Sequence, residues 1–421
     1  MAIKTKRLMK YQHKIMAVLA LLLFVFGQKT SAQPLQNLLL AADSANLELK
    51  ALYQEYLAAL EKAPQVSQLP EPEAGLGVFP LPVETRLGPQ WVRLSATQMF
   101  PWKGTLEARK DVVLAMAKAQ YEQIAASRLN LHYQVKQAYF QLYDLEKRQQ
   151  ILQKSIDIFR TLESISTTRV EAGKANLADV LRIQIRIRGL EEELNMLENQ
   201  KKKPVAVINQ LLNRPEQSPV ALVDTLPLAN PPYDRAALLN DIQEGHPMLR
   251  MFSLQQEAAQ RAVELNALEG KPSFGVGLDY IAVGKRSDAE PMNNGRDILS
   301  PRVGVRIPLY REKYRAKEQE EKLKIQALET RKQNLFLQFR SAIEQAYADL
   351  EDGKIKYRLY QEQKAITASA IELLLTAYSN EGASFIDLLQ LEDQLIQYDL
   401  MTLSAVVKTH IAQAEVERYI P

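Results

Sequence analysis

Enzymatic chemistry requires nucleophiles, acid–base pairs or metal ligands at defined spacings, and the sequence shows none of these arrangements. The four histidines, His13, His132, His246 and His410, are scattered without the spacing of a metal site. Cysteine is absent, which excludes disulfides and thiolate ligands. Phosphate-binding loops, nucleophile elbows and zinc-protease motifs are also absent. We therefore expect a protein that is not an enzyme and that needs no metal or cofactor.

Two aspartates are the best candidates for a charged functional site. Asp179 follows Asn176 by three residues, and Asp387 follows Ser384 by the same distance. Repeated around the axis of an assembly, such carboxylates would form a ring that attracts cations. The same spacing is typical of helix caps, which stabilise a helix start without any gate. The residues favour the capping interpretation slightly, and the two interpretations can hold together.

Asp179 lies at the start of a segment with a heptad pattern. Apolar residues recur there at alternating spacings of three and four, at Val180, Ile183, Ile187, Leu190, Leu194 and Leu197. A strand cannot produce this pattern, which is typical of a coiled-coil helix. A similar pattern, containing Leu152, Ile156 and Phe159, precedes Gly173, and glycine permits a chain reversal. The sequence thus predicts a long helical hairpin that turns at Gly173.

A second hairpin of the same kind is predicted around Gly382. Ser384 and Asp387 provide the cap and the acid, and Leu389, Ile396 and Leu403 then follow seven apart. Two copies of one hairpin indicate an internal duplication. We expect long first arms at 105–166 and 312–379, too long for a globular core. The residues 204–232 are rich in proline, and we place a linker at 214–232 within them. The expected domains are then a first repeat at 33–213 and a second repeat at 233–421.

The first residues are typical of a secretory signal peptide. Residues 1–14 are basic, residues 15–26 are apolar, and the small residues Thr30, Ser31 and Ala32 follow. The apolar run is short for a membrane helix, so cleavage before Gln33 is favoured over an uncleaved anchor. Residues 1–32 carry six Lys or Arg residues and no acid, so the rest of the chain is slightly acidic and charge gives no reason to expect nucleic-acid binding.

Short runs of alternating residues predict β-strands in both halves. In 274–280 and 303–309 every second residue is apolar, and the residues between are small, polar or charged. A weaker alternation occurs at 92–97, and the proline-rich residues 64–82 before it are expected to break the first helix. Alternation fits a strand on a soluble core or a membrane strand with one face to lipid. Open strand edges are not tolerated in lipid, so membrane strands would require several copies in one barrel.

Two groups of aromatic residues are candidates for a position in a membrane channel. Near strand ends, we expect an aromatic belt at the bilayer edge from Trp91, Trp102 and Tyr280. The first long helix carries Tyr133, Tyr139 and Tyr143, which either line a tunnel or pack between helices.

The order of these elements, and the segments 173–181 and 382–389 in particular, resembles the TolC-like outer-membrane efflux proteins. Phe100-Pro101-Trp102 and Ile307-Pro308-Leu309, where strand gives way to helix, also match that family's pattern. The resemblance implies a mainly α fold with a β-barrel part. Three copies would share one barrel of twelve transmembrane strands in the outer membrane, continued through the periplasm by an α-barrel of coiled-coil hairpins.

The resemblance also implies partners and site residues at the hairpin tips. There the family meets a periplasmic adaptor, which couples the channel to an inner-membrane pump, so the candidate adaptor contacts are Gly173, Lys174, Ala175, Gly382, Ala383 and Ser384. Because Arg169 and Tyr378 precede the two aspartates by similar distances and can pair across a closed mouth, the candidate gate residues are Asp179, Asp387, Arg169 and Tyr378. For Arg169 or Tyr378 alone, an ordinary exposed position is the alternative. In the second segment Gln390 stands where some relatives carry an acid, so a double acidic ring is not expected.

Two functions remain from the sequence. The leading one is a passive outer-membrane export channel, and the alternative is a secreted coiled-coil scaffold whose β segments pair outside any membrane. The alternating runs at 274–280 and 303–309 separate the two, because a scaffold has no need of an apolar face for lipid.

Overall fold

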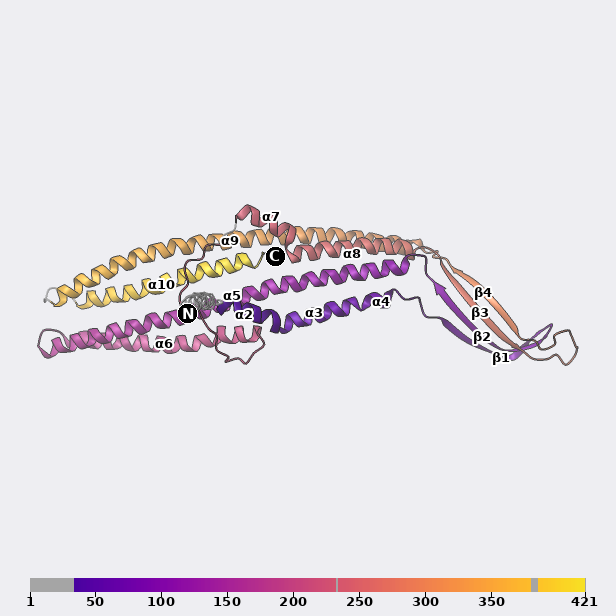
Figure 1. The fold of residues 1–421 in the computed structure, drawn as a ribbon, viewed down its shortest axis with the longest axis horizontal. Helices are drawn as coiled ribbons and strands as arrows, with labels where there is room; N and C mark the ends of the chain where they lie inside the picture. The colour runs from indigo at the N-terminus through magenta and orange to yellow at the C-terminus, as the bar shows by residue number, and fades with distance from the viewer. Residues whose placement is uncertain (1–33, 232–233, 380–384, 421) are drawn as a thin grey trace, which may run out of the picture. The chain divides into compact units, whose positions relative to one another are not determined.

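The computed structural model describes residues 34–231, 234–379 and 385–420, so the predicted signal peptide lies outside the described residues. The prediction of a mainly helical chain with a small antiparallel sheet is confirmed (Figure 1). In chain order the elements are α2 (Pro34–Ala45), α3 (Leu47–Leu60), α4 (Lys62–Val66), β1 (Glu73–Thr85), β2 (Gly88–Phe100), α5 (Thr105–Glu171), α6 (Leu177–Leu211), α7 (Arg235–Gly245), α8 (Pro247–Glu269), β3 (Ser273–Val283), β4 (Ile298–Arg306), α9 (Arg311–Ser379) and α10 (Phe385–Glu417). Among the described residues, no helix combines the length and the apolar character needed to cross a bilayer.

The chain forms two compact units, and each unit draws on both halves of the sequence. Of the described residues, the first unit comprises 34–47, 129–231, 342–379 and 385–418. The second comprises 48–128, 234–341 and 419–420. The long helices α5 and α9 contribute to both units.

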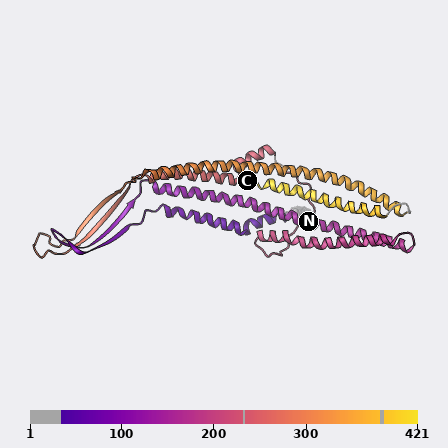
Figure 2. The same ribbon diagram turned by 180° about the vertical axis from the view of Figure 1, so that it is seen from behind.

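The first unit is built on two helical hairpins. In both views α6 runs beside the second half of α5, and α10 runs beside the second half of α9 (Figures 1 and 2). One hydrophobic cluster joins the four helices and includes Leu152, Ile156, Phe159, Ile183, Ile187, Leu190, Ile371, Leu388, Ile396 and Leu400. The predicted heptad positions of α5 and α6 are therefore core positions, except that Leu194 is only half-buried. In α10 the core contains Ile396 of the predicted pattern with Leu388 and Leu400, whereas Leu389 and Leu403 are only half-buried.

The turn of the first hairpin follows from its glycine and its cap. Gly173 has φ of 70°, a left-handed conformation that side chains with Cβ adopt rarely. The amide of Lys174 donates to the carbonyl of Arg169 at 2.8 Å, which closes the end of α5 as in a Schellman motif. The side chain of Asn176 then accepts from the amide of Ala178 at 2.9 Å and starts α6.

The linker after α6 is held by tyrosine side chains of α5. The hydroxyl of Tyr139 accepts from the amide of Val223 at 2.9 Å, and that of Tyr143 accepts from Leu226 at 3.1 Å. Both tyrosines are buried, so they pack between elements of the first unit. Pro204, the first proline of the proline-rich residues 204–232, lies inside α6, so the irregular chain begins only after Leu211.

The second unit contains one antiparallel sheet in the order β1-β2-β3-β4. Strand β1 runs through Pro80 and Pro82, and its register with β2 is interrupted between Val78 and Val83. Proline cannot donate a ladder hydrogen bond, but an edge strand tolerates it. The interpretation of residues 64–82 as only a helix-breaking patch is therefore wrong for its second half, which forms the edge strand.

Candidate functional site

The predicted gate residues Arg169 and Tyr378 come together in the first unit. The guanidinium of Arg169 lies over the ring of Tyr378, with 4.3 Å from Cζ to the ring centroid. Its Nη1 also donates to the main-chain oxygen of Tyr378 at 2.8 Å. This oxygen belongs to the last turn of α9, where free carbonyls favour a positive charge. Arg169 of α5 therefore closes the C-terminal end of α9.

Tyr378 is a buried residue at this contact. Its ring packs against Phe385, the first residue of α10, with 5.5 Å between ring centroids. The Tyr378 hydroxyl and the Nε of Arg169 are buried without a hydrogen-bond partner among the described residues. The contact thus joins the two hairpins close to their turns. The Tyr378 hydroxyl and the Arg169 Nε keep their capacity to form a further hydrogen bond.

A second contact between the hairpins lies further along α6 and α10. The Nε of Arg186 donates to a carboxylate oxygen of Asp393 at 2.6 Å. The neighbouring Glu392 is buried, and burial raises the pKa of its carboxyl group, with a further contribution from the charge of Asp393. These three residues were not predicted, because a single sequence does not reveal which charges of two hairpins face each other.

The two candidate aspartates have different surroundings in the structure. Asp179 is half-buried and bound by Arg182 of the same helix at 2.9 Å. Asp387 lies exposed in the first turn of α10. Among the candidate adaptor contacts, Gly173 and Lys174 are exposed and Ala175 is half-buried, whereas Gly382, Ala383 and Ser384 lie outside the described residues.

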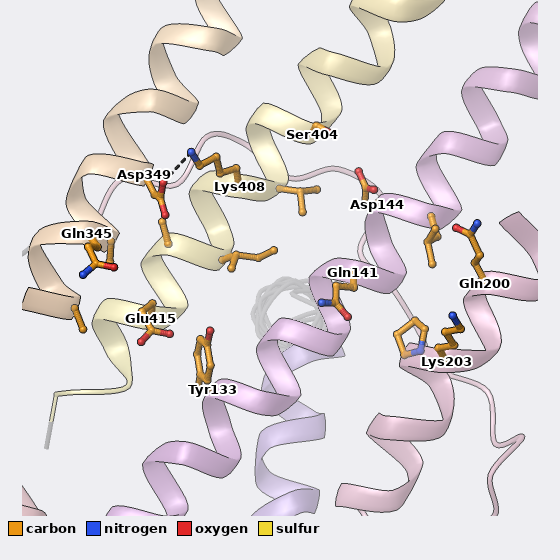
Figure 3. Close-up of a pocket in the computed structure, with 17 residues that line it drawn as sticks. Tyr133, Gln141, Asp144, Gln200, Lys203, Gln345, Asp349, Ser404, Lys408 and Glu415 are labelled. Atoms are coloured by element: carbon orange, nitrogen blue, oxygen red, sulfur yellow. Dashed lines mark ion pairs between the residues drawn. The ribbon is translucent and has the colours of Figure 1, made fainter. Parts of the chain in front are cut away.

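A cavity of about 710 Å³ lies where four helices of the first unit meet (Figure 3). Tyr133 and Asp144 come from α5, Lys203 from α6, Asp349 from α9 and Lys408 from α10. Lys408 forms an ion pair with Asp349 at 2.8 Å, as the dashed line marks. Asp144 is paired with Arg148 at 2.6 Å, and the described residues contain no cluster of metal-ligating side chains. The charges of this cavity therefore largely compensate one another.

The sheet of the second unit has one apolar and one polar face. By register, Leu76, Leu94, Tyr280 and Leu299 form a row across all four strands, and each is at least 41% exposed. The next row contains Gly75, Ser95, Asp279 and Ser300. The predicted alternation therefore holds, and the side chains of this apolar row are exposed among the described residues.

An ion cluster missed by the sequence analysis occupies the polar face. The carboxylate of Asp279 on β3 is bound by Arg93 of β2 at 2.5 Å and lies 3.7 Å from Arg302 of β4. Its side chain is only 7% exposed. The sequence offered a usable signal, because Asp279 follows Gly275 and Gly277 on the polar face of an alternating strand and a base on a neighbouring strand can reach it. The cluster ties the three strands together by charge.

Comparison with known proteins agrees with this geometry. Residues 90–214 match the family model of the outer membrane efflux protein. The fold matches that of the outer-membrane channel OprN, with 17% identity, a TM-score of 0.72, and coverage of 92% of this chain and 89% of that chain. It also matches VceC from Vibrio cholerae, with 13% identity, a TM-score of 0.71, and coverage of 92% and 95%. No curated protein sequence matches this chain.

A third match is the open state of the MtrE outer membrane channel of Neisseria gonorrhoeae, with 17% identity and a TM-score of 0.71. It covers 92% of this chain and 88% of that chain. The chain thus has the fold of outer-membrane efflux channels, and its residues 90–214 match the model of the outer membrane efflux protein family. The resemblance to TolC-like efflux proteins is confirmed.

Proposed function

We propose that this protein is the passive outer-membrane channel of a tripartite efflux or secretion system. The observation that carries the proposal is the exposed apolar face of the sheet beside a charged opposite face. Strands β1 to β4 contain 9 to 13 residues, and about 9–11 residues of a tilted strand cross a bilayer. The apolar face meets lipid and the face with Asp279 meets the lumen.

The open edges of the sheet support an assembly of three copies. In the part of the chain that the structure describes, β1 and β4 each pair on one side only. Unpaired backbone groups cost several kcal/mol each in hydrocarbon, so a membrane sheet must close into a barrel. Three copies of a four-stranded sheet supply twelve strands, the number that the resemblance implies.

The helical hairpins continue this barrel into the periplasm in our proposal. The repeats at 33–213 and 233–421, joined by the linker at 214–232, each contribute one hairpin. The turn residues at Gly173 and Gly382 dock a periplasmic adaptor and, through it, an inner-membrane pump. The contact of Arg169 with Tyr378 holds the mouth closed, and Asp179 and Asp387 line it.

The mass of the purified protein in mild detergent tests the assembly. Three chains per particle are expected, and removal of detergent should cause aggregation because the apolar rows lose their cover. A secreted scaffold predicts the opposite, a chain that stays monodisperse without detergent. A soluble monomer would contradict the channel.

A further inference from the structure

A second cavity, of about 590 Å³, lies in the second unit where the strands end and the helices begin. Thr105, the first residue of α5, lines it from one side. Lys313 and Tyr314, in the first turn of α9, line it from another. Asn266 near the end of α8 and Lys271 before β3 also line the cavity.

The charge of this cavity is strongly positive. Its lining contains one carboxylate, that of Glu269, and five cationic side chains, those of Arg109, Lys271, Arg306, Lys313 and Lys317. Glu269 pairs with Arg109 at 3.0 Å and with Lys317 at 3.4 Å. Among the described residues, no carboxylate forms an ion pair with Lys271, Lys313 or Arg306. Three positive charges therefore stand uncompensated at one site.

Helix ends and a buried hydroxyl add to this preference for an anion. The long helices α5 and α9 both begin at the cavity, and a helix N-terminus carries a partial positive charge and free amides. Glu107 and Glu312 in the first turns of these helices do not line the cavity. The Thr105 hydroxyl is buried without a hydrogen-bond partner among the described residues, in a residue that is 2% exposed.

Aromatic and apolar side chains surround the charged groups. Lys271 lies over the ring of Trp102, with 5.4 Å between Nζ and the ring centroid. Ile307, Leu309 and Tyr310 line the cavity and are 58%, 75% and 86% exposed. Consecutive exposed apolar residues beside uncompensated lysines match an amphiphile that has a phosphate head and hydrocarbon tails. A free phosphate would gain no binding energy from these apolar side chains.

We propose that this cavity binds the phosphate of a membrane phospholipid, with Lys271, Lys313 and Thr105 as its ligands. The acyl chains lie along Ile307–Tyr310 and the apolar face of the sheet. The inference rests on the proposed function, because it places the strand ends at the surface of the bilayer. One bound phospholipid per chain would fix the depth of the sheet in the membrane.

Native mass spectrometry of the full protein in detergent with added phosphatidylglycerol tests the site. The wild type should retain the phospholipid under conditions that strip diacylglycerol, which has the same tails without the phosphate. The double variant Lys271→Gln, Lys313→Gln should lose roughly tenfold or more in retention, because it removes two cationic ligands of the phosphate. Lys322→Gln, the same change further along α9, is the matched control and should bind as the wild type does.

Thr105→Val gives an independent measurement, because it removes a hydroxyl that has no protein partner. It should leave the melting temperature unchanged and weaken retention several-fold. Equal retention by the double variant and the Lys322→Gln control would overturn the inference, and so would displacement of the phospholipid by millimolar inorganic phosphate. A trimer that retains no phospholipid contradicts this site alone, whereas a monomer that retains one contradicts the channel and supports the site.

Discussion

At the scale of single residues, the contact of Arg169 with Tyr378 shows what spacing can and cannot predict. Their positions before the two hairpin turns made them candidates for a pair. The acceptor is a main-chain oxygen at the end of α9, and the ring supplies a stacking surface. Neither detail is encoded in the residue types, because both depend on the approach of two separate hairpins. An exposed position, the alternative for either residue, does not apply to buried Tyr378.

We predict that Arg169→Ala raises the conductance of the channel. The change removes the cation that closes α9 and stacks on Tyr378. The loss of this charged hydrogen bond should weaken the contact between the two hairpins by roughly 1.5–3 kcal/mol. The hairpins should then separate more readily. Arg188→Ala on α6 is the control, because Arg188 is 85% exposed and its pair with Glu191 contributes little. Equal conductance of both variants and the wild type would argue against a role in closure.

His246 gives a prediction on pH. It caps α8 by accepting from the amide of Met248 at 3.1 Å, and its ring packs 4.4 Å from that of Phe339. Burial lowers the pKa of His246 to about 4. An unfolded histidine has a pKa near 6.5, so the unfolded chain takes up the proton first. The contribution that neutral His246 makes to the unfolding free energy is present in full above about pH 6.5 and is lost as the pH falls towards 4.

At pH 5 the protonation of His246 in the unfolded chain should lower the unfolding free energy by about 2 kcal/mol relative to pH 7.5. His246→Asn keeps a capping side chain without the titration, so its loss on acidification should be smaller. The loss should not vanish, since burial also lowers the pKa of His410. Denaturant unfolding at the two pH values measures the difference. The same acid loss in the variant and the wild type would show that His246 is not responsible.

At the scale of elements, local pattern predicted the helices well and the strands in part. The seam of α6 follows directly from heptad spacing, and Ile183 and Leu190 are completely buried. Strand β1 was missed because Pro80 and Pro82 normally exclude a strand interior, and they are tolerated where the register of β1 with β2 is interrupted, between Val78 and Val83. This interruption is a property of the strand pair, which the local sequence does not contain.

The three-strand ion cluster on the polar face leads to a prediction on sheet stability. Asp279→Ala should lower the unfolding free energy by about 1–3 kcal/mol, because Arg93 and Arg302 lose their acceptor. The two tryptophans, Trp91 in β2 and Trp102 just after it, make fluorescence a reporter of this region. Asp288→Ala removes an exposed Asp–Arg pair and should cost little. Similar unfolding midpoints for both variants would contradict the importance of the cluster.

At the scale of the whole molecule, the proposal predicts which parts of the chain face the outside of the cell. Residues 284–297 between β3 and β4 contain Lys285, Arg286 and Arg296, all sites for trypsin. Trypsin added to intact cells should cut there. Lys174, exposed in the turn of the first hairpin and followed by Ala175, is the internal control and should be cut only after the outer membrane is permeabilised. Recovery of the protein in the soluble periplasm, or cleavage at Lys174 alone in intact cells, would contradict the orientation.

The central claim, a passive channel shared by several copies, is tested most directly by single-channel recording in planar bilayers. The wild type and Arg169→Ala should both give discrete, uniform conductance steps under applied voltage alone, with larger steps for the variant. The steps should come from the fraction whose mass corresponds to three chains. The channel would be contradicted if neither the wild type nor Arg169→Ala gave conductance steps although the protein had inserted into the bilayer. Cleavage of residues 284–297 by protease on one side would show the insertion.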